Sequence, residues 1–283
     1  MASNCYPCIL DRAKFESDLV FQTDAEKKAA VEELLDFMAS HKGGVPALVG
    51  TQRELIIKRR CGRPDPYEEL KRESNLVATG LLPVARQFFE ESDNKIEAMV
   101  RIAAAANSME FGVKGHDYDN STFGLVFASI LHEKLEGDLE EVERRLKHFK
   151  NIFYLTDNTG EIIFDLFVIE KLAELGKIVV IGSKSEPILN DVTAEEVRNM
   201  SSNPVLPTGA VVGTTLEDIG PEASKLLFDP DWLVISKGMG NFETMSEFDE
   251  MLKGRLIYVF RAKCEPVAMK IGVPKGTLVV KSI

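Results

Sequence analysis

An Asp-Asn pair at positions 157 and 158 is the feature of the sequence with the clearest chemical potential. The apolar run from Ile152 to Leu155 before it is typical of a buried strand, and residues 161–176 after it have the pattern of a buried helix. The pair therefore follows the carboxyl end of a strand, where open α/β sheets bind ligands. A local alternative stays open, because Asn158 and Glu161 could form a capping box with Asp157 in the turn.

Polar clusters also follow three later predicted strands. They are Ser183 to Ser185 leading to Asn190 and Asp191, Lys237 to Asn241, and Arg261 to Cys264. If the strands are parallel, all of these clusters meet at one edge of the sheet. The oxygen atoms of Asp157, Asn158 and Asp191 then suit an octahedral divalent ion such as Mg²⁺ or Mn²⁺.

Positive charge and bare backbone are predicted at the same edge. Lys237 and Lys263 supply the charge, and Gly238 and Gly240 leave backbone N–H groups free to approach an anion. A metal ion, lysines and such amides are what phosphoryl transfer requires. The sequence has neither G-x-x-x-x-G-K-[ST] nor G-x-G-x-x-G, which disfavours a kinase or a dinucleotide enzyme.

Two polar groups in the first half of the chain could reach the same place. Asn107 and Glu110 end an alanine-rich predicted helix and lie three residues apart, hence on one face. Solvated residues at a helix end would look the same. Asp65 with Lys71 could likewise belong to a site or only begin a helix.

The texture of the sequence changes near residue 150. Residues 9–150 read as almost entirely helical, and residues 151–283 alternate strands with helices, which indicates a mostly parallel sheet. We therefore predict an α/β protein with a helical domain over 1–150 and an α/β metal- and phosphate-binding domain over 151–283. The weaker element predictions are these: a helix over 127–149 broken near Gly137, an irregular segment over 112–123, a strand at 211–212, a helix over 243–252, and a final strand at 278–280 at a sheet edge.

Composition excludes some classes of function. The chain has 283 residues, a net charge of −11 and a pI near 5.0. This acidity argues against a sequence-independent nucleic-acid binder but leaves room for a small anionic substrate in a cleft lined by a few lysines. No signal peptide and no apolar stretch of membrane-spanning length is evident, so the expected location is the cytoplasm, away from the membrane.

The cysteines give a weaker signal. Cys5 and Cys8 have the spacing of a metal or redox pair, but no second such pair exists. Cys264 follows Lys263 at a strand end. These three thiols could form a second site or serve in ordinary packing.

Taken together in order, these segments resemble the damage-control phosphatase family of metal-dependent enzymes. The matching segments are Asp65-Pro66-Tyr67 with Lys71, 106–111, 156–161, 187–193, 237–243 and Lys263-Cys264, which span nearly the whole chain. The Cys-x-x-Cys and Lys-Cys pairs are similar to those of its mainly archaeal branch.

The resemblance implies a helical region packed on a three-layer α/β/α Rossmann-like domain. It implies a phosphoric monoester hydrolase that acts on phosphosugars or damaged phosphometabolites with Mg, Mn, Co or Ni. Asp157, Asn158 and Asp191 would hold the metal, and Asp157, Asn158 and Lys237 would be catalytic. Asn107, Glu110, Lys237, Asn241 and Glu161 would contact the substrate, and Cys5, Cys8 and Cys264 are a further thiol site to test.

Several alternatives stay open at this point. The nucleophile could be Asp157 or a water on the metal, since both chemistries are available to an aspartate beside a metal. A Rossmann-like methyltransferase would use the same sheet edge, although the glycine-rich first turn is absent. A non-enzymatic metal or metabolite sensor would use the thiols instead. The sequence makes no prediction of oligomeric state.

Overall fold

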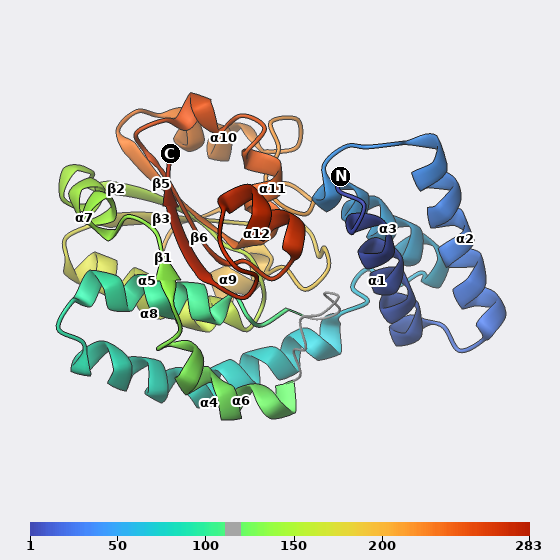
Figure 1. The fold of residues 1–283 in the computed structure, drawn as a ribbon, viewed down its shortest axis with the longest axis horizontal. Helices are drawn as coiled ribbons and strands as arrows, with labels where there is room; N and C mark the ends of the chain where they lie inside the picture. The colour runs from blue at the N-terminus through green and yellow to red at the C-terminus, as the bar shows by residue number, and fades with distance from the viewer. Residues whose placement is uncertain (111–119) are drawn as a thin grey trace.

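A computed structural model describes residues 1–110 and 120–283 of the chain. At its centre is a seven-stranded sheet with the order β1-β7-β6-β5-β2-β3-β4 (Figure 1). The strands are β1 (Leu135–Glu136), β2 (Asn151–Leu155), β3 (Ile178–Ser183), β4 (Val205–Pro207), β5 (Trp232–Lys237), β6 (Leu256–Arg261) and β7 (Leu278–Ser282). Strands β2 to β6 are mutually parallel, whereas β7 runs antiparallel to β6 and carries β1 parallel to itself.

Helices cover both faces of this sheet, which gives the predicted three-layer α/β/α arrangement. The helices are α4 (Glu68–Glu91), α5 (Lys95–Ala106), α6 (Asn120–Ile130), α7 (Leu139–His148), α8 (Glu161–Glu174), α9 (Ala194–Met200), α10 (Pro221–Phe228), α11 (Gly238–Met245) and α12 (Glu265–Ile271), with a 3₁₀ turn η1 over Asp249–Leu252. Helices α4, α5, α6 and α8 lie on one face, and α10, α11 and α12 lie on the other (Figure 1).

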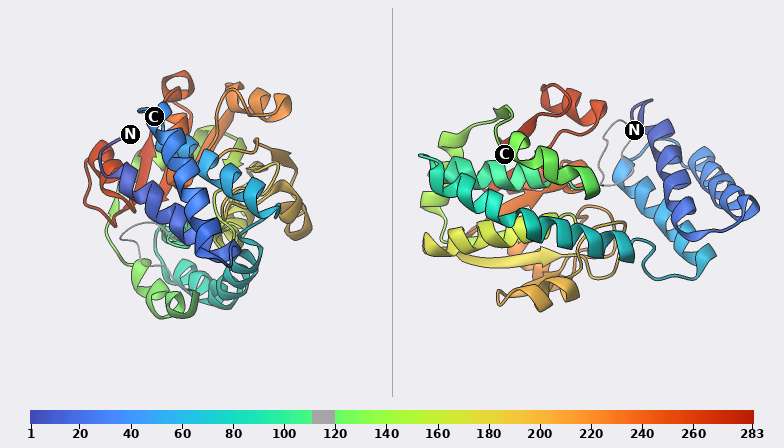
Figure 2. Two further views of the ribbon diagram at one scale, coloured as in Figure 1. Left: turned by 90° about the vertical axis from the view of Figure 1, so that its right-hand side faces the viewer. Right: turned by 90° about the horizontal axis from the view of Figure 1, so that it is seen from below.

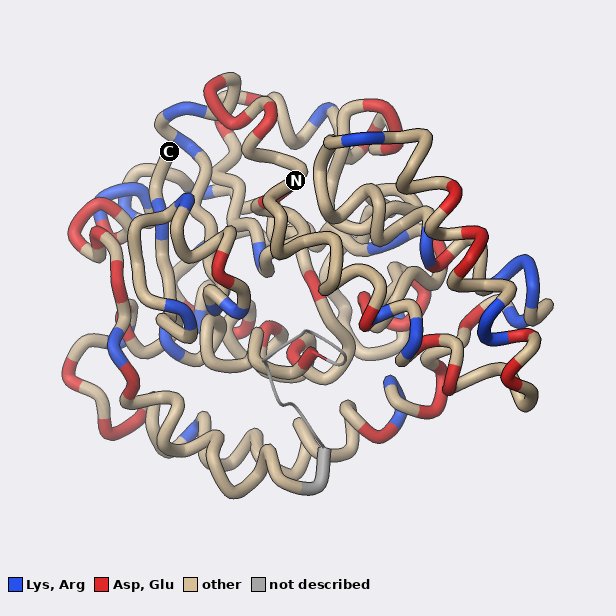
Figure 3. The backbone as a smooth tube through the Cα atoms, turned by 45° about the vertical axis from the view of Figure 1, so that its right-hand side comes forward, with Lys and Arg blue, Asp and Glu red and all other residues tan. Residues whose placement is uncertain are grey.

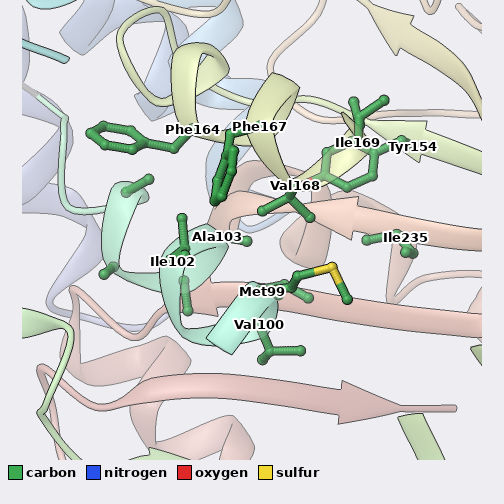
Figure 4. Packing of buried hydrophobic residues seen from close by; sticks show 14 of the residues in the cluster. Met99, Val100, Ile102, Ala103, Tyr154, Phe164, Phe167, Val168, Ile169 and Ile235 are labelled. Atoms are coloured by element: carbon green, nitrogen blue, oxygen red, sulfur yellow. The ribbon is translucent and has the colours of Figure 1, made fainter. Parts of the chain in front are cut away.

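Side-chain alternation along the strands builds a core on each face. Ile152 and Tyr154 of β2 pack with α5 and α8, whereas Phe153 and Leu155 pack against α11 and its neighbours. Figure 4 shows the first core, where Met99 to Ala103 of α5 meet Phe164 to Ile169 of α8. Because both faces are covered, the carboxyl edge of the sheet is the part left to form a site.

The first three helices form a separate lobe at one end of the molecule (Figures 1 and 2). They are α1 (Cys5–Val20), α2 (Asp24–Ser40) and α3 (Pro46–Cys61), and they share a small core that includes Ile9, Leu34 and Ile56. A second cluster, which includes Tyr67, Leu189 and Val212, joins the lobe to the loops at the sheet edge. The lobe therefore covers the carboxyl ends of the strands.

Most predicted elements are confirmed, and six need correction. The segment 127–149 is the end of α6, the short strand β1 and α7, so the sheet extends into the first half of the chain. β7 is not at an edge, because β1 lies outside it. Residues 211–212 are not a strand; the short strand is β4 at 205–207. The helix predicted over 243–252 begins earlier, at Gly238, and ends as a separate 3₁₀ turn. Of the segment 112–123 predicted to be irregular, residues 112–119 lie outside the described part, and residues 120–123 form the start of α6. The alanine-rich helix ends at Ala106, so Asn107 and Glu110 follow it and do not share a helix face as predicted.

None of the helices in the described ranges is long and apolar enough to cross a membrane. Acidic and basic residues are interspersed along the backbone in the view of Figure 3.

Candidate active site

A cavity of about 110 Å³ lies between the helical lobe and the carboxyl edge of the sheet. Its lining includes Arg12 and Arg53 from the lobe, and Glu110, Asp157, Asn158, Asp191, Glu243 and Cys264 from the rest of the chain. The predicted meeting of strand-end groups at one edge is therefore what the structure shows for Asp157, Asn158 and Asp191.

Asp157 is at the centre of a buried network of amides and carboxylates. Its Oδ2 accepts from the Nδ2 of Asn107 at 2.8 Å and from the Nδ2 of Asn158 at 2.9 Å. Both amides also donate to Glu161, at 3.1 Å and 2.8 Å. Burial raises the pKa of Asp157 well above its usual value, and the charges of Glu161 and Asp191 raise it further. The carboxylate is thus held firmly in a place that disfavours its charge.

The capping box predicted as the local alternative for Asn158 and Glu161 is only half formed. Glu161 accepts a hydrogen bond from the backbone N–H of Asn158 at 2.7 Å, as in a capping box. The side chain of Asn158, however, donates to Asp157 and Glu161 and does not cap α8, whose N-cap is Gly160 without a side-chain bond.

Asp191 comes to the same point from the loop after β3. A backbone bridge pairs it with Asn158, and the N–H of Val192 donates to the carbonyl of Asp157 at 2.9 Å. Leu189, two residues before, has a φ of 49°, a left-handed conformation rare for leucine that suggests a constrained turn. Burial raises the pKa of Asp191 to about 6. Its Oδ2 is buried without a hydrogen-bond partner among the described residues, although Lys184 Nζ lies 3.8 Å away.

Lys237 does not reach the cavity. Its Nζ is fully buried and bonds Glu161 at 3.0 Å and Asp165 at 2.8 Å. Burial alone would lower the pKa of Lys237, but the ion pairs with Asp165 and Glu161 outweigh it and raise the pKa. Lys237 therefore holds Glu161 behind the Asp157 network.

Glu110 and Lys263 form a second charged cluster at the cavity wall. Glu110 pairs with Lys263 and, at 2.8 Å, with Nη1 of Arg12. Burial opposes ionisation here, but Lys263 and Arg12 prevail and lower the pKa of Glu110 to about 2. Lys263 also donates to the carbonyl of Asn107 at 2.7 Å, so this cluster is connected to the Asp157 network.

Asn241 is engaged by backbone and by a hydroxyl. Its Nδ2 donates to the carbonyls of Thr156 and Lys237 at 3.0 and 2.7 Å, and its Oδ1 accepts from Thr214 at 2.9 Å. It does not line the cavity, and it ties the start of α11 to the end of β2. Asp65 and the buried Lys71 form a partly buried ion pair at 2.9 Å, and Asp65 also accepts from the N–H of Tyr67.

The three thiols come from α1 and from the N-cap of α12. All are free cysteines; Cys8 and Cys264 line the cavity, and Cys5 lines an adjoining hollow. Burial raises the pKa of Cys264 to about 12, with contributions from Glu243 and the other two cysteines. Within residues 1–110 and 120–283, no three His, Cys, Asp or Glu side chains are grouped to hold a metal ion.

Several residues that line the cavity, from the lobe and from α11, could not be predicted from the sequence. Arg12, Arg53 and Glu243 are the charged ones. The four-residue spacing of Cys8, Arg12 and Glu16 puts them on one face of a helix, but no pattern shows that this face turns toward the sheet. Burial raises the pKa of Glu243 to about 7.

The parallel strands, the lobe over their carboxyl ends and the buried carboxylates at that edge together define an α/β protein with a candidate ligand site at the sheet edge. A sequence profile described as the damage-control phosphatase ARMT1-like domain matches residues 1–279. The chain therefore belongs to the damage-control phosphatase ARMT1-like family, as its sequence motifs predict.

Relatives of known name agree over almost the full length. A protein of Archaeoglobus fulgidus named damage-control phosphatase is 30% identical over 286 residues, which cover 99% of this chain and 98% of the relative. A damage-control phosphatase of Pyrococcus horikoshii is 29% identical, over 97% of this chain and 95% of the relative. A crystal structure of a DUF89 family protein from Pyrococcus horikoshii superposes with a TM-score of 0.85 at 29% identity, over 99% of this chain and 97% of that one.

Proposed function

We propose that the protein is a metal-dependent phosphatase that hydrolyses small phosphate monoesters, such as phosphosugars or damaged phosphometabolites. Membership of the family and the names of two relatives support phosphatase activity. The observation that carries the metal dependence is the burial of Asp157 and Asp191 side by side, with the pKa of each raised. Buried like charges of this kind are stable as anions only when a cation compensates them.

The donor set fits a hard divalent cation. Asp157 and Asp191 supply carboxylate oxygens, Asp191 Oδ2 is a buried acceptor to which no described residue donates a hydrogen bond, and Asn158 supplies an amide. Mg²⁺ and Mn²⁺ are typically bound by a few protein oxygen atoms, and water or substrate completes the coordination shell. Co²⁺ and Ni²⁺ remain in the proposal as alternatives. When bound, such an ion would neutralise the phosphate and polarise its P–O bonds.

The protein's own residues would orient these ligands. The amides of Asn107 and Asn158 hold Oδ2 of Asp157, Glu161 fixes both amides, and Lys237 fixes Glu161. We therefore propose a positioning role for Lys237 in place of direct contact with phosphate. Because outer partners of this kind set the direction of a ligand, their loss typically weakens metal affinity or activity 10- to 100-fold.

The cavity also bears on the substrate. A volume of about 110 Å³, with acidic, basic and thiol groups in its lining, favours a small polar ester over a large apolar one. In this proposal the partner is a small phosphorylated metabolite in the cytoplasm, and nucleic acid and membrane are not substrates.

Phosphate release from a panel of phosphosugars and nucleotides tests the proposal. We expect turnover of some small esters with Mn²⁺, Mg²⁺, Co²⁺ or Ni²⁺, and none after treatment with EDTA. The Asp157→Asn variant should release little or no phosphate, since it keeps the shape of the site but removes the charge of one proposed metal ligand. Release that persists in EDTA and in this variant, or no release from any ester with any metal, would refute the proposal.

A further inference from the structure

Helix α1 presents one charged face to the cavity. Cys8 and Arg12 line it, together with Asp157 and Asp191 from the sheet edge. Glu16 lies one turn further along the same face of α1. The lobe thus contributes an arginine to a site whose proposed metal ligands all come from the α/β part of the chain.

The hydrogen bonds of Arg12 are incomplete. Nη1 donates to Oε1 of Glu110 at 2.8 Å, which fixes one end of the guanidinium. Nε and Nη2 are buried and have no hydrogen-bond partner in the described ranges, and the side chain is only 11% exposed. Buried donors of a charged group are rarely left unpaired, because the loss of their hydration is uncompensated.

The local partner of Arg12 is already occupied. Glu16, four residues along the helix, would be the natural acceptor. Its two oxygens accept instead from Nε of Arg53 at 2.9 Å each, and Oε1 also accepts from the hydroxyl of Tyr67 at 2.9 Å. Arg53 thus uses its Nε on an acid within the lobe, whereas the Nε of Arg12 donates to no acceptor of the described chain.

The unpaired atoms also have a specific shape. Nε and Nη2 form one edge of the planar guanidinium, the fork that binds two oxygens of one phosphate or carboxylate in parallel. Glu110 occupies the opposite end of the group and fixes its plane, and Lys263 in turn pairs with Glu110. The donors are shielded from water, and charge-assisted bonds made there are stronger than in solvent.

We propose that Arg12 is the substrate-binding residue that grips two phosphoryl oxygens through this edge. This inference rests on the proposed phosphatase function and adds a role for the helical lobe. Helix α1 lines the cavity opposite the sheet edge and supplies the phosphate contact that Lys237 does not make.

Binding of inorganic phosphate to the full chain tests this without turnover. Calorimetric titration with phosphate, with and without saturating Mn²⁺, is compared between wild type, Arg12→Met and the control Arg72→Met. Arg72 pairs with Glu69 on an exposed face of α4, away from the cavity. We expect Arg12→Met to weaken phosphate binding about 10-fold or more, with Mn²⁺ binding unchanged and Arg72→Met like wild type.

A second variant separates the fork from the charge. Arg12→Lys keeps the charge and, as the milder change, serves if Arg12→Met does not fold, which circular dichroism and thermal unfolding would reveal. We expect it to regain only part of the lost affinity, since an ammonium has no parallel donors. Phosphate affinity equal to wild type in either variant, or no phosphate binding by wild type, would overturn the role of Arg12.

The failure of this inference differs from failure of the proposed function. Phosphate binding that needs Arg12 in a protein that hydrolyses no ester would refute the phosphatase and keep the anion site. Metal-dependent hydrolysis by a protein whose phosphate affinity is the same with and without Arg12 would support the phosphatase function and refute the role of Arg12.

Discussion

At the scale of single residues, the site is a set of buried charges that are compensated unequally. Glu110 has two cations beside it, and its pKa is low, at about 2. Asp157 accepts from two neutral amides and lies among other acids, and its pKa is raised. No cation of the described residues pairs directly with Asp157, and Lys184 at 3.8 Å offsets only part of the effect of burial on Asp191, so the proposed cation would complete the charge balance there.

Asp157→Asn is expected to reduce metal-dependent turnover by about 10²-fold or more, because it removes one of the two charged ligands proposed for the metal. Folding should not suffer, since the change removes a buried carboxylate that opposes folding. Steady-state rates with Mn²⁺ and thermal unfolding in EDTA check both parts. Wild-type turnover in this variant would remove Asp157 from the site.

Lys237→Met separates a positioning role from a direct one. Its removal would leave Glu161 and Asp165 buried without their cation, so we expect a loss of about 3–5 kcal/mol in the free energy of unfolding, together with lower activity. Urea unfolding measures the first. Unchanged stability with lost phosphate affinity would instead indicate that Lys237 contacts the substrate.

At the scale of elements, the start of α11 is shaped by Asp157. Gly238 has a φ of +80°, and a Cβ there would lie 1.8 Å from Oδ2 of Asp157. Only glycine fits both the backbone conformation and the close approach. The segment from Lys237 to Asn241 is thus the turn that lets β5 enter a helix beside the acid.

Gly238→Ala should therefore destabilise the protein by more than the strain of a positive φ alone, because the added methyl group would overlap Asp157. Gly254 is the matched control, because it has a φ of +84° and no atom of the described residues lies within 4 Å of where its Cβ would be. We expect Gly254→Ala to destabilise by about 1–2 kcal/mol with activity kept, and Gly238→Ala to destabilise by more and to abolish turnover. Equal effects of the two substitutions on stability and rate would contradict this account of the turn.

The interior of the lobe carries a buried acid of its own. Glu54 on α3 is fully buried, and neither of its oxygens has a hydrogen-bond partner within residues 1–110 and 120–283. Burial, with a contribution from Glu16, raises the pKa of Glu54 from 4.5 to about 8. A raised folded-state pKa means that folding takes up a proton, so this group favours folding most below pH 4.5 and loses that contribution as the pH rises to about 8.

Glu54→Gln should remove this dependence. We expect its free energy of unfolding, relative to wild type, to rise by about 3 kcal/mol between about pH 5.5 and about pH 8.5, because the unfolded chain loses this proton near pH 4.5 and the folded protein only near pH 8. Urea unfolding at both pH values, with Glu32→Gln on the exposed side of α2 as control, measures the difference. A difference that does not change with pH would show that Glu54 does not titrate in this range.

At the scale of the whole molecule, the gathering of polar residues at the sheet edge could be predicted from the sequence, but the residues that the lobe adds to the cavity could not. Buried runs such as 151–155 and 232–237 have the composition of strands, and the parallel arrangement brings their ends together. The two- and three-residue strands β1 and β4 are too short to leave a periodic signal. How α1 docks depends on tertiary packing, so Arg12 could not be placed from the sequence.

The face of the sheet to which Lys237 points could have been predicted from the sequence. Leu233 and Ile235 pack on the face of the sheet that α5 and α8 cover, and the two-residue period of a strand puts Lys237 on the same face. Glu161 and Asp165 lie one turn apart at the start of α8 and are its natural partners there. A strand-end position alone does not show that a side chain faces the ligand.

Titration of the metal-free protein with Mn²⁺ shows whether Asp157 and Asp191 bind a divalent cation. It is done with wild type, Asp157→Asn, Asp191→Asn and the exposed control Asp231→Asn. We expect saturable binding by wild type and the control, a rise in their unfolding temperature, and affinity at least about 10-fold weaker in each of the other two variants. No binding by wild type, or binding that both cavity variants keep unchanged, would contradict the proposed metal site.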